Sequence, residues 1–134
     1  MPGRVQVRTI LIVEDEASIA DTLALILSTR GYEARVAYSA EKAIEIISEW
    51  EPHFAVVDVM LPMMNGIDFS IVLKDNYPDC RVLLSSGQPD TGVLLEEALK
   101  KGHRFEVLPK PLHPSHILNA VEDLPPLREP VGDA

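Results

Sequence analysis

Acidic, hydroxyl and basic residues stand at the ends of four short apolar runs in this sequence. Glu14 and Asp15 follow the first run, and Asp58 follows the third. Ser86 ends the fourth run, and Lys110 follows the fifth. Oxygen ligands suit Mg²⁺, and a carboxylate with a free oxygen can attack an activated phosphoryl group as a nucleophile. These residue types predict metal-assisted phosphoryl chemistry, provided that the fold brings the run ends together.

The three carboxylates need a cation if they lie close together. Like charges at short range raise the pKa of at least one carboxyl group unless a positive charge intervenes. Mg²⁺, or Mn²⁺ in its place, would offset this charge, while an ammonium and a hydroxyl would bind the other oxygens of a transferring phosphoryl group. The sequence supplies each of these groups at a separate strand end.

The apolar runs alternate with longer amphipathic stretches, which indicates five strand-helix units. The expected strands are Val7–Val13, Glu33–Ala37, Phe54–Val57, Arg81–Ser85 and Phe105–Leu108. The expected helices are Ala17–Arg30, a second capped by Ser39 with Trp50 on its buried side, Gly66–Asn76, Asp90–Lys101, and a fifth opened by Pro114.

Strict alternation of this kind predicts an α/β fold with a doubly wound parallel sheet and helices on both faces. Sites in such sheets form beyond the carboxyl ends of the strands, where the strand order reverses. The second strand ends in Tyr38 and Ser39, without an acidic or basic group. A peripheral place for this strand fits the five-stranded, flavodoxin-like order 2-1-3-4-5.

Composition limits the remaining possibilities. The chain has 134 residues, so we expect one domain over residues 1–124 and a short proline-rich tail over 125–134, with no output domain. A formal net charge of −9 disfavours direct nucleic-acid binding, which rests on basic patches.

No apolar run approaches the ~20 residues of a membrane helix, and the start resembles no signal peptide, so we expect a cytoplasmic protein without membrane insertion. Cys80 is a lone cysteine, expected in the core.

Four motifs together resemble the receiver domains of bacterial two-component response regulators, the CheY-like family. The resemblance runs from about Arg8 to Val121, and the motifs occur in order at fitting spacings. The motifs are the acidic Ile10–Glu16, the phosphorylation motif Val56–Gly66, the switch-hydroxyl motif Leu83–Gly87 and the lysine motif Leu108–Pro111.

The resemblance implies that Asp58 accepts a phosphoryl group from a phosphohistidine on a sensor histidine kinase or a phosphotransfer protein. It implies that Asp15 is the main acidic Mg²⁺ ligand, joined by Asp58 and the backbone carbonyl of Met60, with Glu14 acting mostly through water. It further implies that Ser86 hydrogen-bonds one phosphoryl oxygen and Lys110 pairs with another.

The resemblance also implies a signalling switch rather than an enzyme, although the domain would assist its own phosphorylation and dephosphorylation. The Lys110–Pro111 peptide is expected to be cis, as in similar proteins. Met60 and Gln88 stand where hydrolysis is tuned in similar proteins. Neither can act as a general acid or base, so no unusually fast self-dephosphorylation is expected.

One position departs from the family pattern. Val107 stands three residues before Lys110, where relatives usually carry an aromatic residue that rotates inward on phosphorylation. One hypothesis is that Phe105, or a shifted helix over Asp90–Lys101, takes over that role. The downstream protein target is unknown. Contact through the fourth helix and fifth strand is expected, with a monomer or weak dimer as the oligomeric state.

Other functions remain as alternatives. A receiver-like interaction module without phosphotransfer is the first, although the sequence retains every expected site residue. A Mg²⁺-dependent phosphatase with an aspartate nucleophile is less favoured, because it needs a second acid where Met60 stands. Flavin nucleotide binding lacks a phosphate-cradling glycine loop after the first strand. His113 and His116 lack a third metal ligand and indicate only a helix start.

Overall fold

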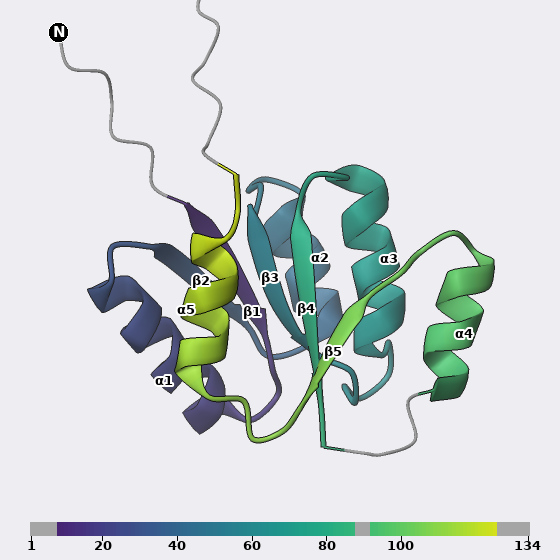
Figure 1. The fold of residues 1–134 in the computed structure, drawn as a ribbon, viewed down its shortest axis with the longest axis horizontal. Helices are drawn as coiled ribbons and strands as arrows, with labels where there is room; N and C mark the ends of the chain where they lie inside the picture. The colour runs from purple at the N-terminus through teal and green to yellow at the C-terminus, as the bar shows by residue number, and fades with distance from the viewer. Residues whose placement is uncertain (1–7, 88–91, 126–134) are drawn as a thin grey trace, which may run out of the picture.

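A five-stranded sheet forms the centre of the molecule, with helices on both of its faces (Figure 1). The computed structural model describes residues 8–87 and 92–125. The strands are β1 (Thr9–Val13), β2 (Glu33–Ala37), β3 (Phe54–Asp58), β4 (Arg81–Ser86) and β5 (Glu106–Pro109). The helices are α1 (Ala17–Thr29), α2 (Ala40–Ile47), α3 (Gly66–Asn76), α4 (Gly92–Lys100) and α5 (Pro114–Glu122).

All strand pairs are parallel, and the spatial order is β2-β1-β3-β4-β5, which confirms the predicted doubly wound fold. Helices α1 and α5 cover one face, and α2, α3 and α4 cover the other (Figure 1). The strand order reverses between β1 and β3, so their carboxyl ends open a crevice at the point where sites form in such sheets.

The central strands are apolar because both of their faces are covered. All five residues of β3 are buried, and so are the last four of β1. Alternate residues of these strands join two hydrophobic clusters, one under α1 and α5 and one under α2 and α3. The burial of both faces holds the strand ends in a fixed register, with Ile12 opposite Val56 and Val13 opposite Val57.

Several expected element ends differ from the structure. Strand β1 begins at Thr9, whereas Val7 lies outside the described residues. Strand β5 begins at Glu106 because its pairing with β4 starts there, one residue after the expected Phe105. Small offsets of this kind are usual at element ends.

Helix α2 is shorter than predicted, and the predicted start of α4 lies outside the described residues. Helix α2 ends at Ile47, so the prediction that Trp50 lies on this helix is wrong. Its indole instead stacks under the guanidinium of Arg35 on the edge strand, 4.6 Å away, and donates a hydrogen bond to Glu33. Helix α4 begins at Gly92 among the described residues, since residues 90 and 91 of the expected span lie outside them.

Side-chain caps fix where two helices near the crevice begin. The Ser39 hydroxyl accepts a hydrogen bond from the backbone N–H of Lys42, as predicted for a cap of α2. The Asn65 side chain accepts from the N–H of Asp68 at 2.8 Å and caps α3. The α3 cap limits the β3–α3 loop to the short stretch after Asp58.

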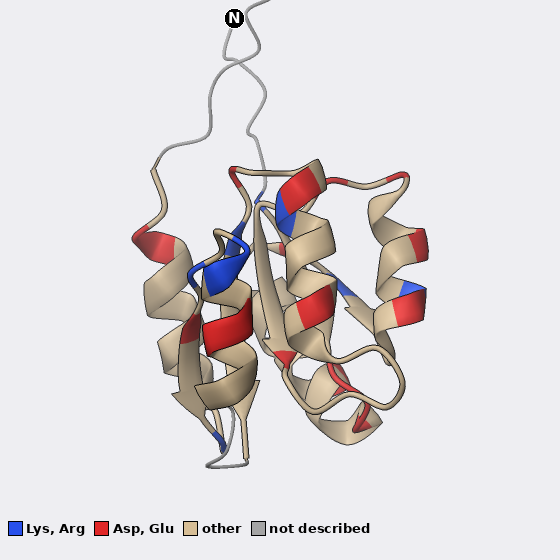
Figure 2. Ribbon diagram, turned by 90° about the vertical axis from the view of Figure 1, so that its right-hand side faces the viewer, with Lys and Arg blue, Asp and Glu red and all other residues tan. Residues whose placement is uncertain are grey.

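Charge lies mainly outside the sheet. Most acidic positions visible in Figure 2 lie on helices and loops around it. Within the described residues, no helix is long and apolar enough to cross a membrane. Most of the expected tail, residues 126–134, lies outside the described residues.

Candidate functional site

Three carboxylates meet in the crevice beyond β1 and β3. Glu14, Asp15 and Asp58 each place an oxygen within 4.8 Å of the other two. Glu14 and Asp58 are only 4% and 5% exposed, whereas Asp15 is exposed. The structure thus brings together three acidic residues from two strand ends, Glu14 and Asp15 after β1 and Asp58 at the end of β3.

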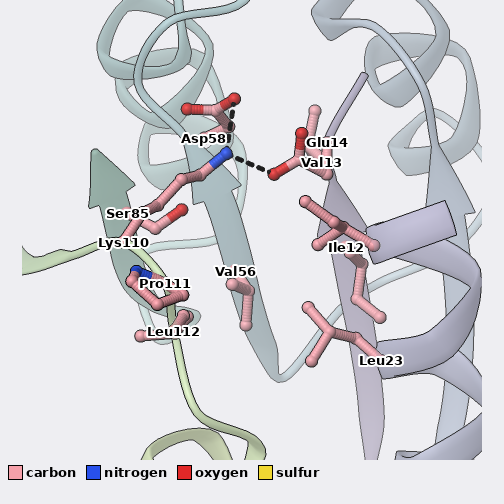
Figure 3. Close-up of a pocket in the computed structure, with 11 residues that line it drawn as sticks. Ile12, Val13, Glu14, Leu23, Val56, Asp58, Ser85, Lys110, Pro111 and Leu112 are labelled. Carbon is pink, nitrogen blue, oxygen red and sulfur yellow. Dashed lines mark hydrogen bonds and ion pairs between the residues drawn. The ribbon is translucent and has the colours of Figure 1, made fainter. Parts of the chain in front are cut away.

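Lys110 reaches the same cluster from the chain after β5. Its Nζ atom lies 2.7 Å from Oε1 of Glu14 and 3.1 Å from Oδ2 of Asp58. Figure 3 shows the ammonium between the two carboxylates, with a hydrogen bond to each. The Lys110–Pro111 peptide is cis, as expected.

Burial and charge act in opposite directions on these groups. Burial raises the pKa of Glu14, and the charge of Asp58 adds to this effect, although the hydrogen bond from Lys110 opposes it. Burial lowers the pKa of Lys110, but its hydrogen bonds to Glu14 and Asp58 outweigh that effect and raise its pKa above the ordinary value. Lys110 therefore stays charged and offsets one of the carboxylates.

The backbone around Asp58 is held by hydrogen bonds to its side chain and to β4. The N–H of Met60 donates to Oδ1 of Asp58 at 3.1 Å. The N–H of Val59 donates to the carbonyl of Ser85 at 2.9 Å, which ties the end of β3 to β4. Asp58 therefore has one oxygen oriented by the backbone and the other by Lys110.

Gly66 is a site residue whose role the sequence analysis missed. A Cβ atom at this position would lie 2.0 Å from the carbonyl oxygen of Asp58. Its N–H donates to the carbonyl of Val59 at 2.9 Å, so the first turn of α3 rests directly on the end of β3. The signal in the sequence is the glycine eight residues after Asp58, at the end of the motif Val56–Gly66.

Two buried serines end β4. Ser85 is the register partner of Asp58 and lines a pocket that reaches the carboxylates. Ser86 follows it, and its carbonyl accepts a hydrogen bond from the N–H of Lys110 at 2.9 Å. By strand alternation, the Ser86 side chain lies on the same face as Leu84, toward α3 and α4. The hydrogen bond to the N–H of Lys110 thus links the backbone of Ser86 to the segment that carries the site lysine.

Val107 stands where relatives usually carry an aromatic residue, and it lies on the face of the sheet that also carries Leu84. Val107 is partly buried and packs against the same hydrophobic cluster as Phe105. The ring of Phe105 stacks on His103, with centroids 5.9 Å apart and an interplanar angle of 3°. His103 also lies 3.5 Å from Asp75 at the end of α3.

The remaining candidates lie elsewhere or outside the described chain. His113 caps α5 by accepting a hydrogen bond from the N–H of Ser115, and its ring contacts His116 edge-on. The metal-ligand cluster found in the described ranges includes neither histidine. Gln88 lies outside the described residues. Cys80 is buried, and burial raises its pKa to about 12, in keeping with a core residue.

The carboxylate cluster fits a hard divalent cation. Its donors are oxygens only, and the exposed Asp15 leaves room for water ligands, which Mg²⁺ usually keeps. One lysine against three carboxylates leaves a net negative charge, so a cation would relieve the repulsion between them.

Comparison with known proteins gives one consistent family. The family model described as "Response regulator receiver domain" matches residues 10–122. The DNA-binding response regulator MtrA of Mycolicibacterium paratuberculosis is 31% identical over 112 residues, which cover 84% of this chain and 48% of MtrA. The DNA-binding transcriptional regulator NtrC of Azospirillum brasilense is 30% identical over 114 residues, which cover 85% of this chain and 23% of NtrC.

A solved structure supports the same assignment. The CheY-like response regulator receiver domain protein from Methanospirillum hungatei has a TM-score of 0.76 and 25% sequence identity, with 88% of this chain and 93% of that chain covered. This chain spans about half or less of the length of MtrA and NtrC.

Proposed function

This chain belongs to the response regulator receiver domain family, and from that premise we propose that it signals by accepting a phosphoryl group on Asp58. A two-component response regulator receives its signal through such a domain. The observation that carries the proposal is the position of Asp58, which has an oxygen within 4.8 Å of oxygens of Glu14 and Asp15 and whose Oδ2 atom lies 3.1 Å from Nζ of Lys110.

The proposed reaction is a phosphoryl transfer between two side chains. A carboxylate oxygen of Asp58 forms a bond to phosphorus, and the bond between phosphorus and the imidazole nitrogen of a donor phosphohistidine breaks. The nitrogen keeps the electron pair of that bond, so the products are an acyl phosphate on Asp58 and a free histidine on the donor. The chain supplies positioning and charge, which dominate phosphoryl-transfer catalysis.

Lys110 holds Asp58 in place before transfer and is proposed to bind a phosphoryl oxygen afterwards. Its bond to Glu14, at 2.7 Å, keeps the ammonium beside Asp58 during this exchange. Ser86 is the proposed hydroxyl donor to a second phosphoryl oxygen. Its contact with the backbone of Lys110 supports a coupled movement of the two residues.

Asp15, Asp58 and the backbone carbonyl of Met60 are the proposed ligands of Mg²⁺ or Mn²⁺, with Glu14 acting through water. When bound, the ion would offset the negative charge of the phosphoryl group. The fit rests on the all-oxygen cluster at the ends of β1 and β3.

The proposed output is a change in protein contacts rather than turnover of a substrate. The family is a signalling family, and a sensor histidine kinase or phosphotransfer protein is the proposed donor. We place the domain within residues 1–124 and in the cytoplasm. Phe105 packs against the same hydrophobic cluster as Val107 and the α4 residues Leu94 and Leu95, and it is the proposed reporter in place of the usual aromatic.

Two alternatives have less support. A phosphatase with an aspartate nucleophile needs a second acid two residues on, where this chain has Met60. A receiver-like module without phosphotransfer has no need for the partly buried contact of Lys110 with Glu14 and Asp58. The second alternative makes a different prediction in the experiment that follows.

Phosphate-affinity electrophoresis after incubation with acetyl phosphate tests the proposal. The wild type should shift in mobility with Mg²⁺ and not with excess EDTA. Asp58→Asn should not shift, whereas Asp79→Asn, a matched change at an exposed loop residue, should behave like the wild type. A wild type that never shifts would favour the module without phosphotransfer.

A further inference from the structure

A cavity of about 160 Å³ lies directly beneath the carboxylate cluster, between α1, the centre of the sheet and the chain after β5. Its apolar part is lined by Ile12, Leu23 and Val56, which are at most 7% exposed. Figure 3 shows these three side chains at one end of the cavity, opposite the charged residues. Dry apolar cavities of ~150 Å³ in proteins accept a molecule the size of benzene.

The opposite end of the cavity is charged. Glu14, Asp58 and Lys110 line it, and two carboxylates against one ammonium leave a net negative charge there. Asp15 adds a third carboxylate within 4.8 Å. A positively charged head group is therefore favoured at this end over a neutral or anionic one.

The cavity also reaches the surface. Ile19, in the first turn of α1, lines it and is 39% exposed, and Pro111 lines it as an exposed residue of the chain after β5. A ligand can therefore enter beside α1 without opening the sheet.

We propose that this cavity binds a small organic cation, with an apolar part the size of one six-membered ring against Ile12, Leu23 and Val56 and one ammonium group beside Glu14 and Asp58. This binding is an activity separate from phosphoryl acceptance, although it shares Glu14 and Asp58 with that site, and it needs no phosphorylation of Asp58. Because the ammonium would use the same negative charge as a divalent cation, the two should compete.

Benzylammonium, benzyl alcohol and benzoate form a matched set of probes, because they share one ring and differ in charge. Their binding is measured by titration of ¹⁵N-labelled protein without divalent cations. Benzylammonium should shift the amide signals of Ile12 and Leu23 saturably. The Kd of benzyl alcohol should be at least about tenfold higher than that of benzylammonium, because the neutral probe lacks the ion pair. The Kd of benzoate should be higher still, because its charge is negative. Mg²⁺ should raise the apparent Kd of benzylammonium.

Leu23→Phe places a ring inside the cavity and should abolish these shifts. Leu25→Phe is the matched control, because Leu25 lies on the same helix and is 66% exposed. Leu112→Trp, which fills the cavity from another wall, gives the same test if Leu23→Phe does not fold. Equal binding of all three probes, absence of saturable shifts in the wild type, or unchanged binding in the cavity-filling variants would overturn the proposal.

Discussion

The Nζ atom of Lys110 lies 2.7 Å from Oε1 of Glu14, although 96 residues separate the two along the chain. This ion pair is shorter than the contact between Lys110 and Asp58, at 3.1 Å. It joins the end of β1 to the chain after β5, across the ends of the intervening strands. The pair gives Lys110 an anchor that does not depend on the state of Asp58.

Lys110→Ala should slow modification by acetyl phosphate by about 10²-fold, because it removes a charged donor from the reacting oxygens. The rate is measured by phosphate-affinity electrophoresis over time. Lys101→Ala, at an exposed position, should keep the wild-type rate. Equal rates in the two variants would remove Lys110 from the reaction.

Glu14→Gln should change how stability depends on pH. Because the folded protein raises the pKa of Glu14 above its ordinary 4.5, the folded state binds more protons than the unfolded state between 4.5 and the raised value. The free energy of unfolding of the wild type should therefore fall as pH rises through that window. Lys110 stays charged there, since its own pKa is raised.

Urea unfolding at a series of pH values between 4 and 8 measures this effect. The Glu14→Gln variant should lose less stability than the wild type over the rise in pH. Glu49→Gln, a change of the same kind at an exposed position, should show the wild-type change in the free energy of unfolding with pH. If the free energy of unfolding changed equally with pH in all three proteins, the burial of Glu14 would not control the pH dependence of stability.

Mg²⁺ should raise the melting temperature of the wild type, because binding to the folded state stabilises it by about 2.7 kcal/mol at 100 times the Kd. Asp15→Asn should lose most of this increase, and EDTA should reverse it. Mn²⁺ should act in the same way. Calorimetry with and without the ion gives the comparison, and a full increase in Asp15→Asn would place the cation elsewhere.

Gly66→Ala should destabilise the fold by about 1–3 kcal/mol, because the added methyl group meets the carbonyl oxygen of Asp58 and the backbone must shift. Chemical unfolding measures the loss. Gly92→Ala, where a Cβ meets nothing within 4 Å, is the matched control at the first residue of another helix. Equal stability of the two variants would contradict the close approach of α3 to β3.

The sheet order was predictable from sequence because the buried strands are continuous apolar runs and the acidic and basic residues follow them. Asp58 and Lys110 could be placed at one edge by this rule alone. The end of α2 was harder to predict. Trp50 has the spacing of a helical core residue, but its indole stacks with Arg35 of the edge strand, a contact that no local pattern reveals.

The contacts between the site residues could not be predicted from the sequence either. The pairing of Lys110 with Glu14 depends on how far each side chain extends beyond its strand, which residue spacing does not give. The need for glycine at residue 66 arises from the distance between α3 and the carbonyl of Asp58. Both relations depend on packing between segments that are distant in sequence or separated by a loop.

The central claim is that Asp58 carries the phosphoryl group, and locating the modification tests it most directly. After treatment with acetyl phosphate and Mg²⁺, borohydride reduces an aspartyl phosphate to homoserine, which tandem mass spectrometry can assign to one residue. We predict homoserine at residue 58 in the wild type, in a quantity that matches the phosphorylated fraction. Homoserine at another acidic residue, or its appearance in Asp58→Asn at the wild-type level, would contradict the account.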